Sequence, residues 1–400
     1  MSILSILDIN ITNKILLIRS DLNVPIDCKG NIISDIRIRL SLPTIKYAIN
    51  KGAKIIIASH LGRPIEGLYN HIFSLKNISQ YLENILNYKV TLQKNYLNKL
   101  NIQKNEIIML ENVRFNIGEK NNNEELSKKY ASLCDIFVMD AFATSHRKHS
   151  STYGVIKYAN KSCAGLLLIN ELNNLNKIFK KPKHPIISIV GGSKISTKFN
   201  VLNKLAKLSD KIIVGGGIAN TFLAINNNIG QSLYEPNALI LAKKLKEEYN
   251  NIIIPIDCKV GTSFSNNTLV KTKKINNILL NEKIMDIGKN TIKIIVDILN
   301  TAKTILWNGP VGVFELTNFN EGTKTIAYTI ANSDAFSIAG GGDTLAAIEL
   351  FNLFNKISYI STGGGSFLNF VEGKKLPCVS ILKKYQNINS IYYDDLNNHY

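Results

Sequence analysis

The sequence predicts an α/β protein with two doubly wound, Rossmann-like parallel-sheet domains joined by a linker helix and a hinge. Short runs of β-branched residues alternate along the chain with stretches of helical length and period. Nearly continuous apolar strands of this kind are typical of a parallel sheet with helices on both faces. The alternation occurs in two series, and 400 residues are too many for one ordinary core.

The predicted strands of the first series lead into polar turns, and most of those of the second lead into turns that contain glycine or proline. The first series comprises 15–18, 55–58, 107–110 and 136–139. The second comprises 186–190, 212–214, 252–254, 304–307, 336–339 and 357–361. Helical periodicity between strands is clearest at 197–208 and 344–354.

The domain boundary is predicted in residues 171–183, a Lys- and Asn-rich helical stretch that ends at Pro182 and Pro185. The predicted domains are therefore 1–170 and 171–385. The polar tail 386–400 could pack back on either domain, and the first is the placement we predict.

The sequence favours a cytoplasmic protein without a membrane span. Its start has no basic region before the apolar residues, and Asp8 and Asn10 interrupt them early, so no signal peptide is predicted. The longest apolar runs are about five residues, whereas a membrane helix needs about 20. The five cysteines form no CxxC pair, so we expect reduced thiols.

The net charge of +18 does not by itself identify a nucleic-acid-binding protein. Lysine is spread along the whole chain beside Asn and Ile, a bias typical of an AT-rich coding sequence. We interpret it as compositional drift with nonspecific attraction to polyanions, while a selected basic surface stays open as an alternative. No aromatic RNA-binding motif or zinc finger occurs, so no specific nucleic-acid partner is predicted.

Arginine is rare and confined to the first half of the sequence. Of 48 basic residues only six are Arg, at positions 19, 37, 39, 63, 114 and 147. Where lysine is accepted almost everywhere else, the remaining arginines indicate positions that need a planar bidentate donor for phosphate or carboxylate. The alternative is that some survive only in buried ion pairs.

Three histidines add to this cationic set, His60, His146 and His149. Together with the arginines they predict a basin in the first domain for a small, multiply anionic substrate. His146 and His149 could form a metal pair, but no local Asp, Glu or Cys supplies a third ligand, and we predict no metal there.

Glycine clusters take the place of arginine in the second half. They lie at 191–192, 215–217, 340–342 and 363–365, each at a passage from strand to helix. Glycine there lets backbone N–H groups approach phosphate oxygens, which predicts a nucleotide site. The Walker, dinucleotide-fold and protein-kinase motifs are absent from the sequence. Because ligands of open α/β sheets bind beyond the carboxyl ends of strands, we expect two facing binding surfaces.

Motifs of both halves resemble those of phosphoglycerate kinases, in order and over essentially the full length. In the first half they are 19–25 (RSDLNVP), 59–64 (SHLGRP), 110–115 (LENVRF) and 140–147 (DAFATSHR). In the second half they are 191–198, 215–219 (GGGIA), 307–315 (WNGPVGVFE), 340–344 and 361–365 (STGGG).

The resemblance implies a set of ligand-binding residues. 3-Phosphoglycerate would be held by Asp21, Leu22, Asn23, Arg37, His60, Leu61, Gly62, Arg63, Arg114 and Arg147. ATP would be held by Lys198, Glu315, Gly341, Gly342, Asp343 and Thr344. Glu315 would accept from the ribose hydroxyls, and Asp343 would help to hold Mg²⁺ with the phosphates. Arg19 would be structural, and Arg39 would either support the site or be a surface charge.

The implied reaction is reversible phosphoryl transfer between ATP and the carboxylate of 3-phosphoglycerate, by a monomer. The carboxylate is ionised at neutral pH and needs no general base, so catalysis is alignment and charge neutralisation. We assign that work to Arg37 and Lys194, one in each domain, with backbone N–H groups at Gly342 and Gly365. Hinge closure would exclude water.

The sequence departs from the family pattern at Ala143, Lys289, Ser366 and Cys378, which bears on hinge behaviour, affinity and stability. Two rival interpretations remain: another α/β phosphotransferase or ligase, and a degenerate homologue that binds nucleic acid. Turnover with both substrates would exclude the second.

Overall fold

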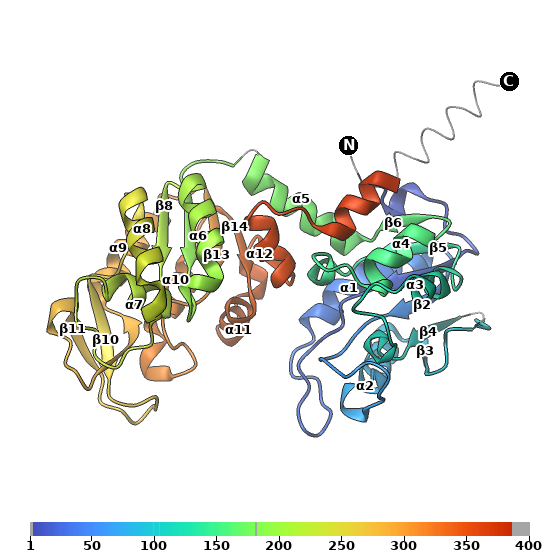
Figure 1. The fold of residues 1–400 in the computed structure, drawn as a ribbon, viewed down its shortest axis with the longest axis horizontal. Helices are drawn as coiled ribbons and strands as arrows, with labels where there is room; N and C mark the ends of the chain where they lie inside the picture. The colour runs from blue at the N-terminus through green and yellow to red at the C-terminus, as the bar shows by residue number, and fades with distance from the viewer. Residues whose placement is uncertain (1–2, 99, 104, 181, 386–400) are drawn as a thin grey trace. The chain divides into compact units, whose positions relative to one another are not determined.

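Two parallel sheets, one in each half of the chain, confirm the predicted fold class. The computed structural model describes residues 3–98, 100–103, 105–180 and 182–385. The described chain forms unit 1, which contains 3–173 and 375–385, and unit 2, which contains 174–374 (Figure 1). The predicted tail 386–400 lies outside the described residues.

Unit 1 is built on a six-stranded sheet of order β3-β4-β2-β1-β5-β6, in which all paired strands are parallel. Its strands are β1 (Ile15–Arg19), β2 (Lys54–Ala58), β3 (Lys89–Gln93), β4 (Glu106–Leu110), β5 (Ile136–Met139) and β6 (Ser162–Ala164). Its helices are α1 (Ile36–Asn50), α2 (Lys76–Leu86), α3 (Glu124–Ala131), α4 (Val155–Tyr158) and the first part of α5 (Leu166–Lys180). All four strands predicted in this half are present.

Local sequence explains why the unit 1 elements begin and end where they do. Asn123 caps α3, since its side chain accepts from the backbone N–H of Leu126 at 2.9 Å. Helix α2 buries Ile78 and Leu82, one turn apart, and ends at Leu86, before the C-cap residue Asn87, whose φ of 49° is left-handed. Strand β1 is buried from Leu16 onward, as a central parallel strand should be.

Unit 2 repeats this plan with a six-stranded parallel sheet of order β15-β14-β13-β7-β8-β9. Its strands are β7 (Ile186–Val190), β8 (Lys211–Val214), β9 (Ile252–Ile253), β13 (Thr304–Asn308), β14 (Phe336–Gly340) and β15 (Tyr359–Ser361). Its helices are α6 (Ile195–Leu208), α7 (Gly216–Leu223), α8 (Leu239–Glu248), α9 (Lys289–Asn300), α10 (Glu321–Ala331), α11 (Gly342–Leu350) and α12 (Gly365–Val371). The six strands predicted here are confirmed.

A second, antiparallel sheet in unit 2 was not predicted. It has the order β11-β10-β12 and consists of β10 (Asp257–Gly261), β11 (Lys271–Lys274) and β12 (Lys283–Ile287). Its edge strand β11 has the sequence KTKK and is largely exposed, so it carries no apolar signal. Lysine on an edge strand opposes pairing with another chain.

Two expected boundaries differ from the structure. The helix expected at 344–354 begins at Gly342 and ends at Leu350. The predicted division assigned 375–385 to the second domain, whereas these residues belong to unit 1. There the backbone N–H of Cys378 donates to the carbonyl of Ser145 at 3.2 Å, and the Tyr385 hydroxyl donates to the carbonyl of Lys157 at 2.5 Å.

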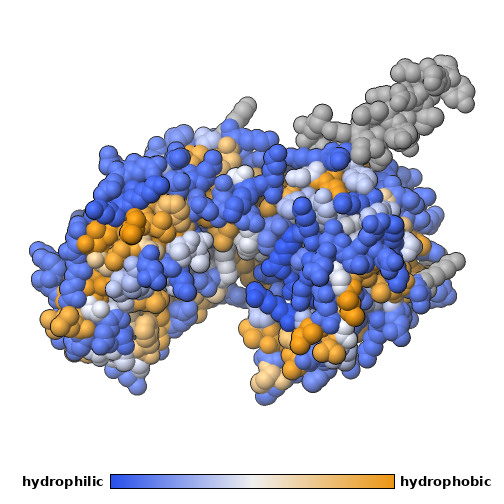
Figure 2. Space-filling view, in the orientation of Figure 1, coloured by the Kyte–Doolittle hydropathy of each residue, from blue (hydrophilic) through white to orange (hydrophobic). Residues whose placement is uncertain are grey.

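Single-turn helices connect several of these elements. They are Ile6–Asp8, His71–Phe73, Val113–Phe115, Phe142–Thr144, Pro236–Ala238, Ile275–Asn277, Thr317–Phe319 and Phe354–Lys356, with a π-helical turn at Ser150–Gly154. The visible face of each unit is mostly hydrophilic, with apolar side chains between (Figure 2). In the described parts of the chain, no helix is both long and apolar enough to cross a bilayer. All five cysteines are free thiols.

Candidate functional site

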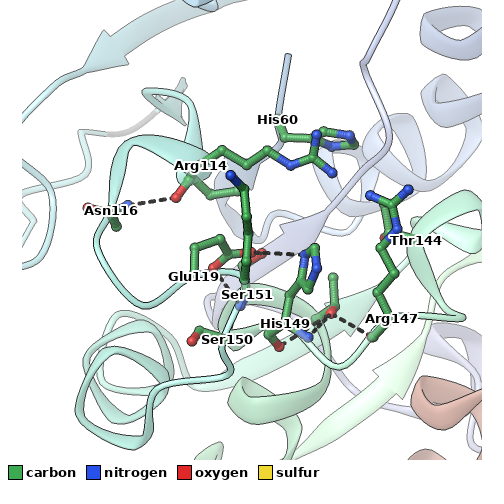
Figure 3. Close-up of polar contacts among 12 residues, drawn as sticks. His60, Arg114, Asn116, Glu119, Thr144, Arg147, His149, Ser150 and Ser151 are labelled. Carbon is green, nitrogen blue, oxygen red and sulfur yellow. Dashed lines mark hydrogen bonds and ion pairs between the residues drawn. The ribbon is translucent and has the colours of Figure 1, made fainter. Parts of the chain in front are cut away.

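In unit 1 the predicted basic residues gather beyond the carboxyl ends of the parallel strands. Arg19 ends β1, His60 follows β2, and Arg114 lies in the turn after β4. Arg147 and His149 come from the segment after β5. Figure 3 shows the ring of His60 and the guanidinium groups of Arg114 and Arg147 pointing toward the same space. A parallel sheet puts strand ends at one edge, which brings these distant segments together.

Two short polar side chains organise the rim of this basin. Asp21 is buried, and its Oδ2 pairs with Nη1 of Arg37 at 2.8 Å. The Arg37 side chain is 29% exposed to solvent, so a ligand can still reach it. Asn23 Oδ1 accepts from the backbone N–H of Gly62 at 2.8 Å and fixes the loop after His60. Gly62 has a φ of +60°, and a Cβ there would meet the Phe73 ring at 2.4 Å.

The positive charges in the basin disfavour one another. Burial, together with the charges of Arg147 and Arg19, lowers the pKa of Arg114 to about 10. Burial also lowers the pKa of His60 well below its usual value, and four neighbouring arginines act in the same direction. The pKa of His149 falls to about 3, first through burial and then through Arg114. An anion bound here would relieve this repulsion.

Sequence reasoning missed the carboxylate behind these cations. Glu119 is fully buried, and its oxygens accept from the Ser151 hydroxyl at 2.6 Å and the Ser151 backbone N–H at 3.0 Å. The Ser151 hydroxyl also accepts from Nε of Arg19 at 3.0 Å. Glu119 follows Arg114 in a Gly- and Asn-rich loop, where the sequence gives no sign that it is buried. Its role becomes visible only from its contacts with the Ser150–Gly154 turn.

The remaining basic residues lie in different surroundings. Arg147 Nε donates to His146 Nε2 at 3.0 Å. Arg63 is exposed on its loop. Arg39 pairs with Asp35 at 2.6 Å on α1 and is 64% exposed, so it is a surface charge and not part of the basin. The structure thus brings together five predicted substrate residues, Asp21, Arg37, His60, Arg114 and Arg147.

In unit 2 two of the four glycine clusters contribute to a cavity of about 280 Å³, which Gly192, Gly216 and Gly217 help to line. Its walls come from the loop after β7, the start of α7, the antiparallel sheet and the segment 310–315. Apolar side chains such as Leu223, Val311 and Phe314 form much of the lining. Glu315 and Asp343 are the exposed carboxylates at its edge. An apolar slot with few polar groups suits a nucleoside.

Glycines in and near this cavity permit close backbone approach. A Cβ on Gly191 would lie 1.8 Å from the carbonyl oxygen of Pro310, and one on Gly217 would lie 2.4 Å from that of Ser193. By contrast, a Cβ on Gly342, the first residue of α11, would meet nothing within 4 Å. The start of α11 therefore has room for a ligand beside its free backbone N–H groups.

Lys198 is the most perturbed amine near the cavity. Its Nζ donates to the carbonyls of Gly191 at 2.6 Å and Asn308 at 3.2 Å. Burial lowers its pKa to about 8, which Asp343 partly opposes. Lys194 is exposed at the N-cap of α6. Thr344 accepts from the backbone N–H of Gly309 at 2.7 Å, so its hydroxyl joins the loop after β13 to α11.

A second carboxylate that sequence reasoning did not assign lies at the cavity wall. Asp286 accepts from the backbone N–H groups of Ile287 at 2.9 Å and Gly322 at 2.8 Å. Burial raises its pKa to about 7. It is part of β12, in the antiparallel sheet that was not predicted, which explains why it was overlooked.

The family model described as phosphoglycerate kinase matches residues 6–374. The phosphoglycerate kinase of Buchnera aphidicola subsp. Schizaphis graminum is 59% identical over 385 residues, covering 96% of this chain and 99% of the relative. That of Haemophilus influenzae is 53% identical, with 96% and 99% covered.

Two solved structures have the same fold. The phosphoglycerate kinase from Coxiella burnetii superposes with a TM-score of 0.88 at 46% identity, covering 96% of this chain and 100% of its own. That from Pyrococcus horikoshii gives a TM-score of 0.84 at 30% identity, covering 95% and 98%.

Proposed function

The chain belongs to the phosphoglycerate kinase family, and we propose that its two sites divide the substrates of that reaction between them. It is a glycolytic phosphotransferase with a carboxyl acceptor. The reaction is reversible transfer of a phosphoryl group between ATP and 3-phosphoglycerate, giving 1,3-bisphosphoglycerate and ADP.

The basin of unit 1 is the proposed site for 3-phosphoglycerate. The observation that carries this is the convergence of His60, Arg114 and Arg147 in an environment that lowers the pKa of His60 and Arg114. A ligand with a phosphate and a carboxylate supplies the missing negative charge, and arginine can bind both groups in bidentate fashion. Arg63 and the 21–23 and 60–62 segments complete the proposed set.

The cavity of unit 2 is the proposed nucleotide site. Its apolar walls would hold the base, and Glu315 at the edge would accept from the ribose hydroxyls. Lys198 and the start of α11, with Gly341, Gly342 and Thr344, would face the phosphates.

Mg²⁺ fits this site as a partner of the nucleotide. No cluster of three His, Cys, Asp or Glu able to hold a metal occurs among the described residues, so the chain would contribute one carboxylate. Asp343 is exposed at the cavity edge and suits that role. Mg²⁺ is usually held by one or two carboxylates plus substrate phosphates, and when bound it would neutralise phosphate charge.

For the transfer itself, Arg37 and Lys194 are the proposed catalytic side chains, with backbone N–H groups of Gly342 and Gly365. The attacking carboxylate is already ionised, so these groups align the reactants and neutralise the transferring phosphoryl group. Arg37 belongs to unit 1 and Lys194 to unit 2. Turnover therefore requires both units, and we propose a closing motion, a cytoplasmic location and a monomeric state.

A coupled assay tests the proposal, with Mg·ATP and 3-phosphoglycerate and reduction of the 1,3-bisphosphoglycerate formed. ADP should appear only when both substrates are present. Arg37→Ala should lower kcat by about 100-fold or more, because the residue neutralises charge that develops in transfer. Arg39→Ala, an exposed arginine on the same helix, is the matched control. An unchanged kcat in Arg37→Ala would refute the assigned role.

A further inference from the structure

Arg19 contacts a ring nitrogen of His60 inside the unit 1 basin. We propose that Arg19 is a positioning residue that fixes His60 as a neutral imidazole with its proton on Nε2, and that Glu119 holds Arg19 in place through Ser151. The inference rests on the proposed function, in which His60 contacts 3-phosphoglycerate. It adds the atom of His60 that makes this contact.

The direction of the contact follows from the chemistry of arginine. Nη2 of Arg19 lies 3.4 Å from Nδ1 of His60. A guanidinium group has only donors, so Nδ1 must present its lone pair to Arg19. The other tautomer would aim an N–H at a cation. The carboxylate oxygen nearest to Nδ1, Oδ1 of Asp21, is 3.9 Å from it and therefore too far to accept a hydrogen bond.

The doubly protonated ring is also disfavoured. His60 is buried and lies in the field of Arg19, Arg114, Arg147 and Arg37, and these effects keep its pKa well below the usual value. The ring therefore stays neutral at neutral pH, with its one proton on Nε2. Phosphate and carboxylate oxygens only accept hydrogen bonds, so an Nε2–H group can bind them and an Nε2 lone pair cannot.

Arg19 needs its own support because it is only 1% exposed. Its Nη1 donates to the carbonyl of Ser20 at 2.5 Å, and its Nε donates to the Ser151 hydroxyl at 3.0 Å. That hydroxyl must use its proton for Glu119 Oε1, which lies 2.6 Å away.

When Glu119 is ionised, each hydrogen bond that links Glu119 through Ser151 and Arg19 to His60 thus has one allowed direction. Glu119 has no exposed surface, and the basic groups around it are Arg19, Arg114 and His149. Burial raises the pKa of Glu119 to about 7, against the effects of Ser151 and Arg19, and above that pH its negative charge offsets the buried guanidinium, whose removal from water would otherwise be costly.

The tautomer is directly measurable in the whole protein by long-range ¹H–¹⁵N correlation of the histidine rings. The His60 signals are assigned by their loss in His60→Gln. We expect an unprotonated Nδ1 and a protonated Nε2, with no titration across neutral pH. A protonated Nδ1, or conversion to imidazolium in that range, would overturn the inference. If the tautomer is as expected but 3-phosphoglycerate leaves Nε2 unshifted, the inference on the tautomer stands and the assignment of His60 to substrate fails.

Two variants test the support. Arg19→Lys keeps the charge but replaces the three separate nitrogens that contact Ser151, Ser20 and His60 by one ammonium nitrogen. Ser151→Ala removes the link to Glu119. Each should give mixed tautomer signals and raise the KM for 3-phosphoglycerate about tenfold, while the KM for ATP stays unchanged. Arg39→Lys, at an exposed arginine, controls for the chemical change. A single wild-type tautomer in both folded variants would refute the positioning role, and if neither folds, the wild-type spectrum decides.

Discussion

At the scale of single residues, four of the six arginines, Arg19, Arg37, Arg114 and Arg147, surround His60 in the unit 1 basin, whereas lysine is spread along the whole chain. The unit 1 basin combines Arg19, Arg114 and Arg147 with two buried carboxylates, Asp21 and Glu119. The predicted substrate residues came from motifs that lie at strand ends, where the sequence signal is local. Glu119, Ser151 and Asp286 were not found, because their roles depend on contacts between segments far apart in the chain.

Lys198 should make nucleotide affinity depend on pH. Its pKa is lowered to about 8 by burial, so the free protein loses this positive charge as pH rises through about 8. ATP binding should therefore weaken over that range. Lys198→Met should bind ATP about tenfold more weakly at neutral pH and lose the pH step. Calorimetric titration with ATP at several pH values measures both. Lys207→Met, at an exposed position of α6, is the control, and an identical step in Lys198→Met would contradict the assignment.

Asp140 should shape the pH dependence of stability. Its Oδ1 accepts from the backbone N–H groups of Leu167 and Leu168 at 2.9 and 3.2 Å, and burial raises its pKa to about 6. The folded protein thus holds this proton more tightly than the unfolded chain. The resulting stabilisation is fully present below the ordinary pKa of aspartate and is lost as pH rises through about 6.

Asp140→Asn should remove this loss of stability with rising pH. For a pKa raised from 3.8 to about 6, the loss amounts to ~3 kcal/mol in the free energy of unfolding. Urea unfolding at several pH values measures it. Asp297→Asn, at an exposed carboxylate on α9, should keep the dependence of the unmodified protein. If Asp140→Asn keeps this pH dependence too, a group other than Asp140 takes up the proton.

At the scale of elements, apolar runs predicted the whole parallel sheet of unit 2 and the four central strands of unit 1, but not the two edge strands of unit 1 or the antiparallel sheet. β3 and β11 were missed because their sequences, KVTLQ and KTKK, are polar enough to read as loops. β6 was missed because three residues are too few to show a period. The antiparallel sheet matters for function since Asp286 on β12 ties the cavity wall to the start of α10.

The cap of α3 offers a test at this scale. Asn123 accepts from the backbone N–H of Leu126, and replacing such a cap by alanine costs about 1 kcal/mol. Asn123→Ala should lower the free energy of unfolding in urea by that amount. Asn121→Ala, in the same run of three asparagines and also exposed, is the control. Equal losses in the two variants would show that the loop as a whole matters more than the cap.

At the scale of the whole molecule, the net charge of +18 acts on substrates that are multiply anionic. A positive field raises their encounter rate, and salt screens it over a Debye length of about 8–10 Å at physiological ionic strength. The kcat/KM for 3-phosphoglycerate should therefore fall several-fold as salt rises from low to physiological concentration. Steady-state kinetics in a salt series measures this, with sucrose as an uncharged control solute. A flat profile would mean that the lysines do not steer substrate.

Unit 1 takes residues from two separate stretches of the chain, 3–173 and 375–385, while unit 2 is one continuous stretch. This fixes an order of completion during synthesis. When the ribosome has released residue 374, unit 2 has every residue it needs, but unit 1 still lacks Cys378, which hydrogen-bonds to Ser145 and Arg147 beside the anion basin. The anion basin that is encoded first is therefore the one that is finished last, and under the proposed division of substrates the nucleotide site would be complete before the site for the acid.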